Sequence, residues 1–210
     1  MKKIILSILL SFSALTCFAL DKKSDALGFG FSTPFIMESA NSNGMKTFAT
    51  MSSIAFGMHG TTLYTDKLGI YSSCDLLLPL TLTGTITNGS ETVTLNAKRS
   101  DYTSLWGLTA MLGPAICISK TEKNLFIISP GIHYYMLFAD ANRKSTASYV
   151  FGVGANFQFT LLFGSNGFFN VGGDVAFDFF GFSRLESYSG FTKSVMFSIA
   201  PKVGVGFRFQ

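Results

Sequence analysis

The sequence predicts an all-β protein, an eight-stranded antiparallel transmembrane β-barrel of the up-and-down type. Apolar residues alternate with small or polar ones over long segments, and only 13% of the 210 residues are charged although 48% are hydrophobic. Such an apolar composition excludes a disordered chain. Beyond the N-terminus, no segment approaches the ~18 consecutive apolar residues of a transmembrane helix, which excludes a helical membrane bundle.

The N-terminal segment predicts a signal peptide. Lys2 and Lys3 precede an apolar run over 4–12, and Ala19 is a small residue at a suitable cleavage position. We therefore divide the chain into a signal peptide, 1–19, and an outer-membrane β-barrel domain, 20–210.

Two other interpretations of the N-terminal segment are less favoured. Several hydroxyl residues, among them Ser7 and Ser11, interrupt a segment already short for an anchoring helix. A lipoprotein cleaved before Cys17 would place Thr16 where a small residue is expected. The bacterial type of the signal predicts export beyond the inner membrane.

Charge and cysteine content exclude several classes of partner. Loss of Lys2 and Lys3 lowers the net charge from +4 to +2, too little to predict binding of nucleic acid. Cys74 and Cys117 lack the close spacing of a metal or redox motif, so we expect no metal site and no cofactor. The two cysteines fall on opposite strand faces, which disfavours a disulfide between them.

The clearest alternation lies at the C-terminal end and in the segment that follows Ser148. Apolar residues occupy every odd position of both segments, while the even positions are mostly small or polar, with Val150 and Met196 as exceptions. A two-residue period indicates strands whose faces meet different environments, and both segments exceed the length of ordinary soluble strands. The odd positions are Val195, Phe197, Ile199, Pro201, Val203, Val205, Phe207 and Phe209, and Tyr149, Phe151, Val153, Ala155, Phe157, Phe159, Leu161 and Phe163.

Eight strands follow from this pattern, and their connections alternate in length. Short turns at 65–67, 120–124 and 164–167 contrast with longer, polar connections, as in outer-membrane barrels with short periplasmic turns and both termini in the periplasm. The predicted strands are 26–37, 47–64, 68–82, 103–118, 125–138, 147–163, 168–182 and 193–209, and the longer loops are 38–46, 83–102, 139–146 and 183–192.

With Lys193 at the rim counted as part of the preceding loop, the five charged residues inside the predicted strands all have the parity opposite to the apolar rows. A barrel in lipid can place such groups in its lumen, whereas a basic group facing the bilayer midplane costs roughly 2–4 kcal/mol. The predicted lumen-lining residues are Asp75, His133, Tyr135, Asn156, Gln158, Asp174, Asp178, Lys202 and Arg208.

A strand register set by a loop centred near residue 188 places Asp174 opposite Lys202 and Asp178 opposite Ser198. We interpret Asp174 and Lys202 as an ion pair that neutralises charge inside the barrel rather than as a transport device.

A soluble β-sandwich or lipocalin-like barrel is the main alternative fold. Its polar strand face would be solvated, but the inward row here is poor in long charged side chains and rich in glycine, which suits a narrow eight-stranded barrel.

Aromatic residues also gather near both expected interfaces with the membrane. Phe126, Phe163, Phe169, Phe207 and Phe209 lie near the periplasmic ends, and Phe35, Phe48, Trp106, Phe138, Tyr149 and Phe179 near the external ends.

The segment 81–95 predicts a hairpin that protrudes from the membrane. Asn88-Gly89 is a strong turn signal, with Thr87 expected opposite Ser90. This pairing would point residues of the wrong parity outward in the membrane strands, so the chain requires an irregular joint, most simply at 98–101. This hairpin is the best candidate for contact with an external partner.

The histidines do not predict an enzyme. Acyl-transfer chemistry in a small barrel requires a base histidine near the external rim, with a serine or an acid in reach. His133 is expected below the rim, beside Thr109 and Gly152, and His59 toward the periplasm. Neither histidine has the spacing of a metal site.

Lys202, Gly204, Phe207 and Phe209 resemble the polar-x-Gly-x-x-aromatic-x-aromatic assembly signal of bacterial outer-membrane proteins, although Gln210 extends beyond the usual terminal aromatic. The mature chain as a whole resembles the small eight-stranded barrels of the OmpW, OmpX and OmpA types, with the OmpW type nearest.

The resemblance implies recognition by the barrel-assembly machinery, contact with outer-membrane lipid, and location in the bacterial outer membrane with surface-exposed loops. The OmpW-type resemblance implies a passive channel, or porin, for small hydrophobic solutes. The alternative is a non-conducting surface barrel used for adhesion, host interaction or membrane structure.

Overall fold

The structure, a computed structural model, describes residues 24–42, 45–141, 144–185 and 188–209. The predicted signal peptide lies outside these residues. No helix long and apolar enough to cross a membrane occurs among them.

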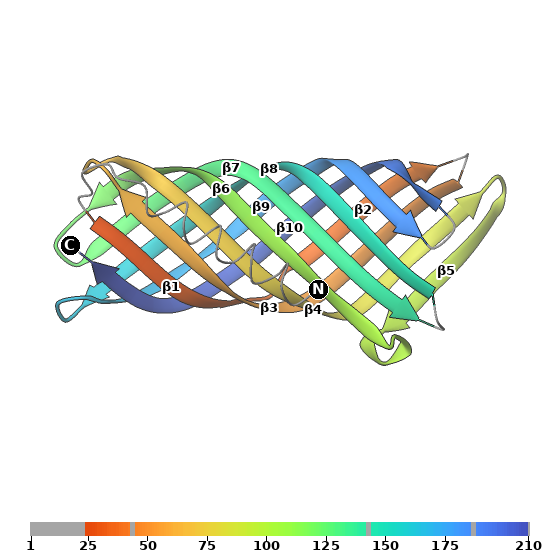
Figure 1. Ribbon diagram of the computed structural model, residues 1–210, viewed down its shortest axis with the longest axis horizontal. Helices are drawn as coiled ribbons and strands as arrows, with labels where there is room; N and C mark the ends of the chain where they lie inside the picture. Colours follow the sequence, from red (N-terminus) through yellow and green to blue (C-terminus); the bar gives the residue numbers. More distant parts are fainter. Residues whose placement is uncertain (1–23, 43–44, 142–143, 186–187, 210) are drawn as a thin grey trace.

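The described chain is one antiparallel sheet that closes on itself where β1 pairs with β10 (Figure 1). The predicted antiparallel up-and-down barrel is therefore confirmed. The strands are β1 Ser24–Ser32, β2 Phe35–Ser42, β3 Met45–Leu63, β4 Leu68–Asn88, β5 Glu91–Lys98, β6 Ser104–Lys120, β7 Asn124–Ala141, β8 Lys144–Phe163, β9 Gly167–Leu185 and β10 Tyr188–Phe209, with a 3-10 helix, η1 Arg99–Asp101, between β5 and β6.

Ten strands form eight barrel positions because β1 and β2 share one position and β5 adds none. Ser32 pairs with Lys202 and Phe35 with Ile199, so the register continues unchanged across the interruption. The interruption contains Pro34, which has no N–H to give to a ladder. β5 pairs with β4 beyond the point where β6 leaves it. The first predicted strand is thus interrupted.

The two ends of the barrel differ. The turn end holds the tight turns after β3, β6 and β8 together with the start of β1 and the end of β10, and the hairpin end holds the projecting β4 and β5 (Figure 1).

The prediction of long loops was wrong, because most residues of these segments belong to strands. β4 runs to Asn88, β2 to Ser42 and β7 to Ala141. A polar sequence marks the edge of the membrane but does not end a strand, since neighbouring strands still satisfy its main-chain groups.

The turn of the hairpin is as short as Asn88-Gly89 suggested, with Gly89 at a φ of 62°. Asn88 pairs with Glu91 and Thr87 with Thr92, so the expected pairing of Thr87 with Ser90 was wrong by two positions.

An irregular joint does lie at 98–101, where η1 interrupts the chain and the Asp101 carboxylate accepts the Lys98 N–H at 2.7 Å. A second irregularity, not predicted from the sequence, occurs on β4. Ser53 pairs with Pro79 and Ser52 with Thr81, so β4 has one extra residue at this point. As a result, odd residues of β4 point into the lumen before the irregularity and even residues point inward after it.

Burial alternates along the strands as the two-residue period predicted. In the central parts of β8 and β10 most odd residues are exposed on the outside, including Phe157, Phe159, Val205 and Phe207, while the even residues are mostly buried. Exposed outward aromatics occur at both ends, such as Phe163 and Phe209 at the turn end and Phe35 and Phe48 toward the hairpin end. Cys74 and Cys117 are both free.

Candidate functional site

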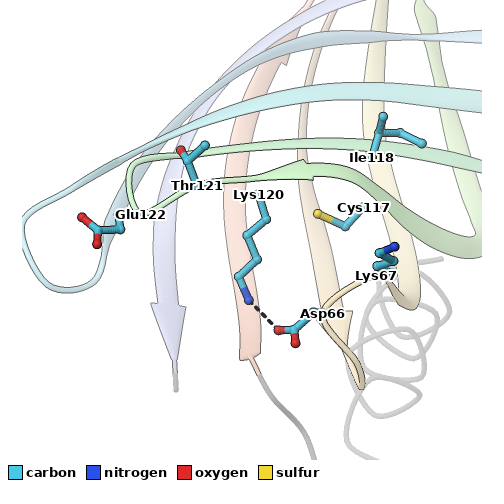
Figure 2. Close-up of a pocket in the computed structure, with 7 residues that line it drawn as sticks. All are labelled: Asp66, Lys67, Cys117, Ile118, Lys120, Thr121 and Glu122. Atoms are coloured by element: carbon cyan, nitrogen blue, oxygen red, sulfur yellow. Dashed lines mark hydrogen bonds and ion pairs between the residues drawn. The ribbon is translucent and has the colours of Figure 1, made fainter.

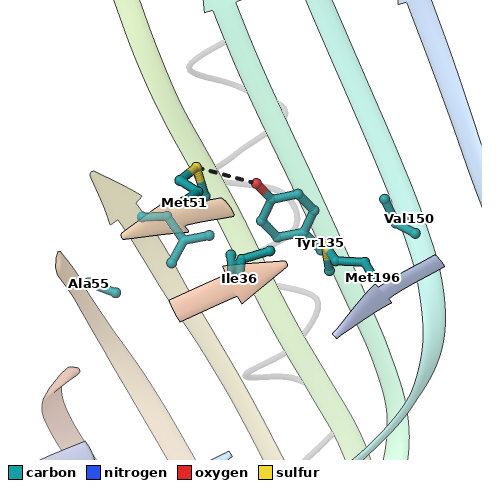
Figure 3. Close-up of a cluster of buried hydrophobic side chains, with 7 residues drawn as sticks. Ile36, Met51, Ala55, Tyr135, Val150 and Met196 are labelled. Atoms are coloured by element: carbon teal, nitrogen blue, oxygen red, sulfur yellow. Dashed lines mark hydrogen bonds between the residues drawn. The ribbon is translucent and has the colours of Figure 1, made fainter. Parts of the chain in front are cut away.

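Each end of the lumen holds a layer rich in buried apolar side chains, although buried polar residues such as Ser194 and Thr160 lie among them. The hairpin-side layer includes Ile36, Met51, Ala55, Leu77, Tyr135, Val150 and Met196, with Leu82 and Leu137 packed against it (Figure 3). The turn-side layer contains Leu63, Tyr71, Met111, Ala115, Cys117, Leu125 and Ile127. A central polar layer lies between them and contains most of the predicted lumen-lining residues.

Lys202 on β10 contacts two carboxylates in the central layer. Its Nζ lies 2.5 Å from Asp174 Oδ2 on β9 and also forms an ion pair with Asp75 on β4. All three side chains are at most 12% exposed. Asn156 Nδ2 donates to the other Asp174 oxygen at 2.7 Å. The cluster therefore carries two formal negative charges and one positive charge when all three groups are ionised.

The predicted Asp174–Lys202 pair is present, but the predicted register was wrong. Lys202 lies opposite Gly172, Asp174 opposite Ala200, and Asp178 opposite Met196. Tyr188 pairs with Leu185, so the two strands are not centred on residue 188. The observed pairing differs from the predicted one by two residues, so each side chain still points to the predicted side of the sheet. The long Lys202 side chain reaches Asp174 diagonally across the two strands.

Asp75 was predicted to face the lumen, but its contact with Lys202 was not anticipated. The two residues are 127 positions apart on strands that do not pair with each other. Gly57 leaves room for the Asp75 carboxylate at the position where it contacts Lys202, because a Cβ on residue 57 would lie 1.9 Å from Asp75 Oδ1.

His133 on β7 connects a hydroxyl to a carboxylate. Its Nδ1 lies 2.8 Å from Asp178 Oδ2 on β9, and its Nε2 lies 2.6 Å from Thr109 Oγ1 on β6. Thr109 and Gly152 are neighbours of His133 as expected, but the expectation that no carboxylate lies in reach was wrong.

Gly152 explains why this contact is hidden in the sequence. It lies on β8, between His133 and Asp178, and pairs with both residues. A Cβ on Gly152 would lie 2.6 Å from Asp178 Oδ1. The missing side chain lets the imidazole reach the carboxylate across an intervening strand.

The order hydroxyl, imidazole and carboxylate resembles a hydrolase triad. Here His133 is 5% exposed and Asp178 is 0% exposed, and the group adjoins the packed hairpin-side layer. The arrangement supplies a buried carboxylate with a hydrogen-bond partner.

His133→Ala is expected to destabilise the barrel by about 3–5 kcal/mol, because Asp178 would lose its partner while buried. Equilibrium unfolding in urea, with the protein in lipid vesicles, measures the change. His133→Ala combined with Asp178→Asn should recover most of the loss, since an amide carries no charge. Equal stability of the single variant and the wild type would contradict a paired Asp178.

The other predicted lumen residues occupy different places. Tyr135 lies in the hairpin-side layer, where its hydroxyl points to Met51 Sδ at 3.9 Å (Figure 3). Gln158 Nε2 donates to Thr160 at 3.2 Å. Arg208 borders a cavity of about 20 Å³ at the turn end.

A small cavity adjoins the central layer. The cavity lined by His59, Asp75, Asn156 and Lys202 measures about 10 Å³, about the space that one water molecule needs. His59 itself is buried and contacts Asn170 Nδ2 at 2.9 Å. The described side chains around this cavity therefore leave space for about one water molecule.

A larger pocket, of about 610 Å³, is open at the turn end (Figure 2). It lies between the turns that follow β3 and β6, and an ion pair of 3.0 Å joins Lys120 to Asp66 at its edge. Both partners are substantially exposed, so this pair contributes little to stability. None of the predicted lumen-lining residues borders the pocket.

No family model matches the sequence, and no curated protein matches it. Several solved structures share the fold. The outer membrane protein OprG from Pseudomonas aeruginosa matches with a TM-score of 0.62 at 16% identity, over 90% of this chain and 97% of OprG. The outer membrane protein AlkL matches with a TM-score of 0.56 at 10% identity, over 92% of this chain and 93% of AlkL.

Neisserial surface protein A, NspA, matches with a TM-score of 0.53 at 9% identity, over 87% of this chain and 97% of NspA. The resemblance to small outer-membrane β-barrels, first indicated by the sequence, is thereby confirmed at the level of the fold.

Proposed function

We propose that this protein is an outer-membrane β-barrel that takes up small apolar molecules at its hairpin end and remains closed to polar solutes. The observation that carries the proposal is a row of exposed apolar side chains on the inner face of the β4–β5 hairpin, which lies next to Leu82 and the buried hairpin-side layer. The closed central layer determines which solutes are excluded.

The apolar surface begins on the inner side of the β4–β5 hairpin. Leu82 packs against the hairpin-side layer and so identifies the inner face of β4. Ile86 lies on the same face, with Val93 directly opposite it on β5. Val93 is 57% exposed and the next inner residue on β5, Leu95, is 43% exposed. Exposed apolar side chains of this kind favour contact with an apolar ligand.

The central layer supports closure to polar solutes. A hydrated ion or sugar crossing the lumen would have to displace Lys202 from two carboxylates, in a region with space for about one water molecule. Breaking buried ion pairs without replacing their partners is strongly unfavourable.

We further propose that the hairpin end faces outward and the turn end faces the periplasm. Short periplasmic turns, longer external segments and both strand termini at the periplasmic end are the arrangement of outer-membrane barrels. The exposed apolar rows of β8 and β10 would then contact outer-membrane lipid, and the barrel-assembly machinery would insert the chain.

Uptake by reconstituted protein tests the proposal. Vesicles containing the folded mature protein should take up an apolar aromatic dye several times faster than empty vesicles, but should not swell in a small sugar. Ile86→Gln should reduce dye uptake because it places an amide on the apolar surface. Thr85→Gln, on the opposite face of the same strand, is the matched control and should keep full uptake. Sugar entry through the wild type would contradict a closed lumen.

A non-conducting surface barrel is the second candidate function, and the ion-paired central layer favours it. Such a barrel would serve adhesion, host interaction or membrane structure. A folded protein that passes neither dye nor sugar would support this candidate over the uptake proposal.

A further inference from the structure

The β5 strand has one open edge. Among the described residues it pairs only with β4, which itself continues the sheet on the other side through β3. The eight residues of β5 are almost all exposed. An exposed strand edge offers unpaired N–H and C=O groups to any further strand.

The pairing of β5 with β4 shows which main-chain N–H and C=O groups of β5 point to its open edge. In an antiparallel pair, alternate residues direct both main-chain groups toward the partner and the remaining residues direct them away. Lys98 N–H is bound by the Asp101 carboxylate and therefore points away from β4. Thr92, Thr94 and Asn96 share the parity of Lys98, so their main-chain groups form the free edge.

The charges of β5 select the direction of a second strand. Glu91 begins the strand, whereas Lys98 and Arg99 stand at its other end, and no charged residue lies between them. An antiparallel second copy brings opposite charges together at both ends, while a parallel copy brings like charges together. In the antiparallel pair, Glu91 of one copy lies beside the basic end of the other without standing directly opposite Lys98, and the Coulomb attraction between these ends favours the antiparallel direction.

We propose that β5 pairs with β5 of a second copy, antiparallel and centred on Thr94. This register places Thr94 opposite Thr94 and Thr92 opposite Asn96, which allows about six main-chain hydrogen bonds. On the inner face it places Val93 opposite Leu95 at two symmetric positions. Apolar residues thus meet apolar residues, and polar residues meet polar residues.

The antiparallel direction determines where the second copy lies. Two upright barrels in one membrane both run β5 from the hairpin tip toward the barrel, so their strands could meet only in parallel. Barrels in two facing membranes run β5 in opposite directions. The proposed contact therefore joins two membranes, as between neighbouring cells or vesicles, and many weak contacts between the same two surfaces reinforce one another.

Clustering of proteoliposomes tests the pairing. Vesicles carrying the wild-type protein should aggregate, as measured by dynamic light scattering, while protein-free vesicles should remain dispersed. Thr94→Pro removes an N–H from the free edge but not from the β4 ladder, and should reduce clustering several-fold. Thr94→Val retains the N–H and should cluster like the wild type. Both variants must retain heat-modifiable migration, which shows that the barrel is folded.

Exchange of charges tests the antiparallel direction. Glu91→Lys vesicles should cluster poorly with themselves, and so should Lys98→Glu vesicles. A mixture of the two should cluster again, because the positive ends of one variant's strand then meet the negative ends of the other's. Clustering of Thr94→Pro at the wild-type level, or a mixture no better than its components, would overturn the proposal. Dye uptake does not depend on this edge and should be unchanged in Thr94→Pro.

Discussion

Lys202→Met is expected to lower the free energy of unfolding by about 3–5 kcal/mol, because it leaves two buried carboxylates without their shared cation. Asp75 and Asp174 approach the same Nζ from strands on different sides of the lumen. Methionine fills a volume similar to that of the lysine stem, so the measured loss reports mainly on charge. Urea unfolding of the protein in lipid vesicles, followed by tryptophan fluorescence of Trp106, measures the change.

Carboxylate variants provide the controls for this prediction. Asp174→Asn alone should cost much less, about 1 kcal/mol or below, because Lys202 keeps Asp75 as its partner and no buried charge is left unpaired. Asp75→Asn and Asp174→Asn together with Lys202→Met should recover most of the stability lost in the single variant. If Lys202→Met unfolds at the wild-type urea concentration, the lysine does not hold the central layer.

The small expected effect of Asp174→Asn illustrates what the sequence could not provide. Sequence parity placed Asp174 and Lys202 in the lumen, since a two-residue period assigns every strand residue to one of two faces. It could not place Asp75 beside the same lysine, because β4 and β10 are not neighbours in the ring. Contacts across a lumen depend on how the sheet closes, and one strand pattern carries no information about that.

Local register was predictable only in part. The Asn88-Gly89 turn and the joint at 98–101 follow from turn chemistry and facing. The β9–β10 turn carries no comparable signal, and the predicted pairing was shifted by two residues. A shift of two keeps the facing of each side chain, which explains why the lumen-facing rows and the Asp174–Lys202 contact survive the error.

The His133–Asp178 contact was missed for a different reason. An intervening strand normally separates residues two strands apart, and only the glycine at position 152 opens the way between them. The signal in the sequence is a glycine on the inward row beside a histidine. It becomes informative once the register of three consecutive strands is known.

Phe209→Asp is expected to reduce the amount of folded protein in the outer membrane several-fold while leaving refolding in vitro nearly unchanged. Phe209 ends β10, is 56% exposed on the outside, and pairs with Asp25 at the seam where β1 closes the barrel. Near the edge of the membrane an acidic residue costs only about 0–1 kcal/mol, so the folded state should tolerate it. Phe209 is also part of the motif that resembles an assembly signal, so its loss should slow insertion by the cellular machinery.

Phe163→Asp separates these two effects. Phe163 is 57% exposed at the same end of the barrel but lies outside the C-terminal motif. If recognition by the assembly machinery is what matters, Phe163→Asp should insert nearly normally and Phe209→Tyr should restore insertion, as measured by heat-modifiable protein in isolated outer membranes. Equal losses for Phe163→Asp and Phe209→Asp would instead mean that both residues act as membrane-facing aromatics, because a carboxylate at either position would then disturb the same contact with lipid.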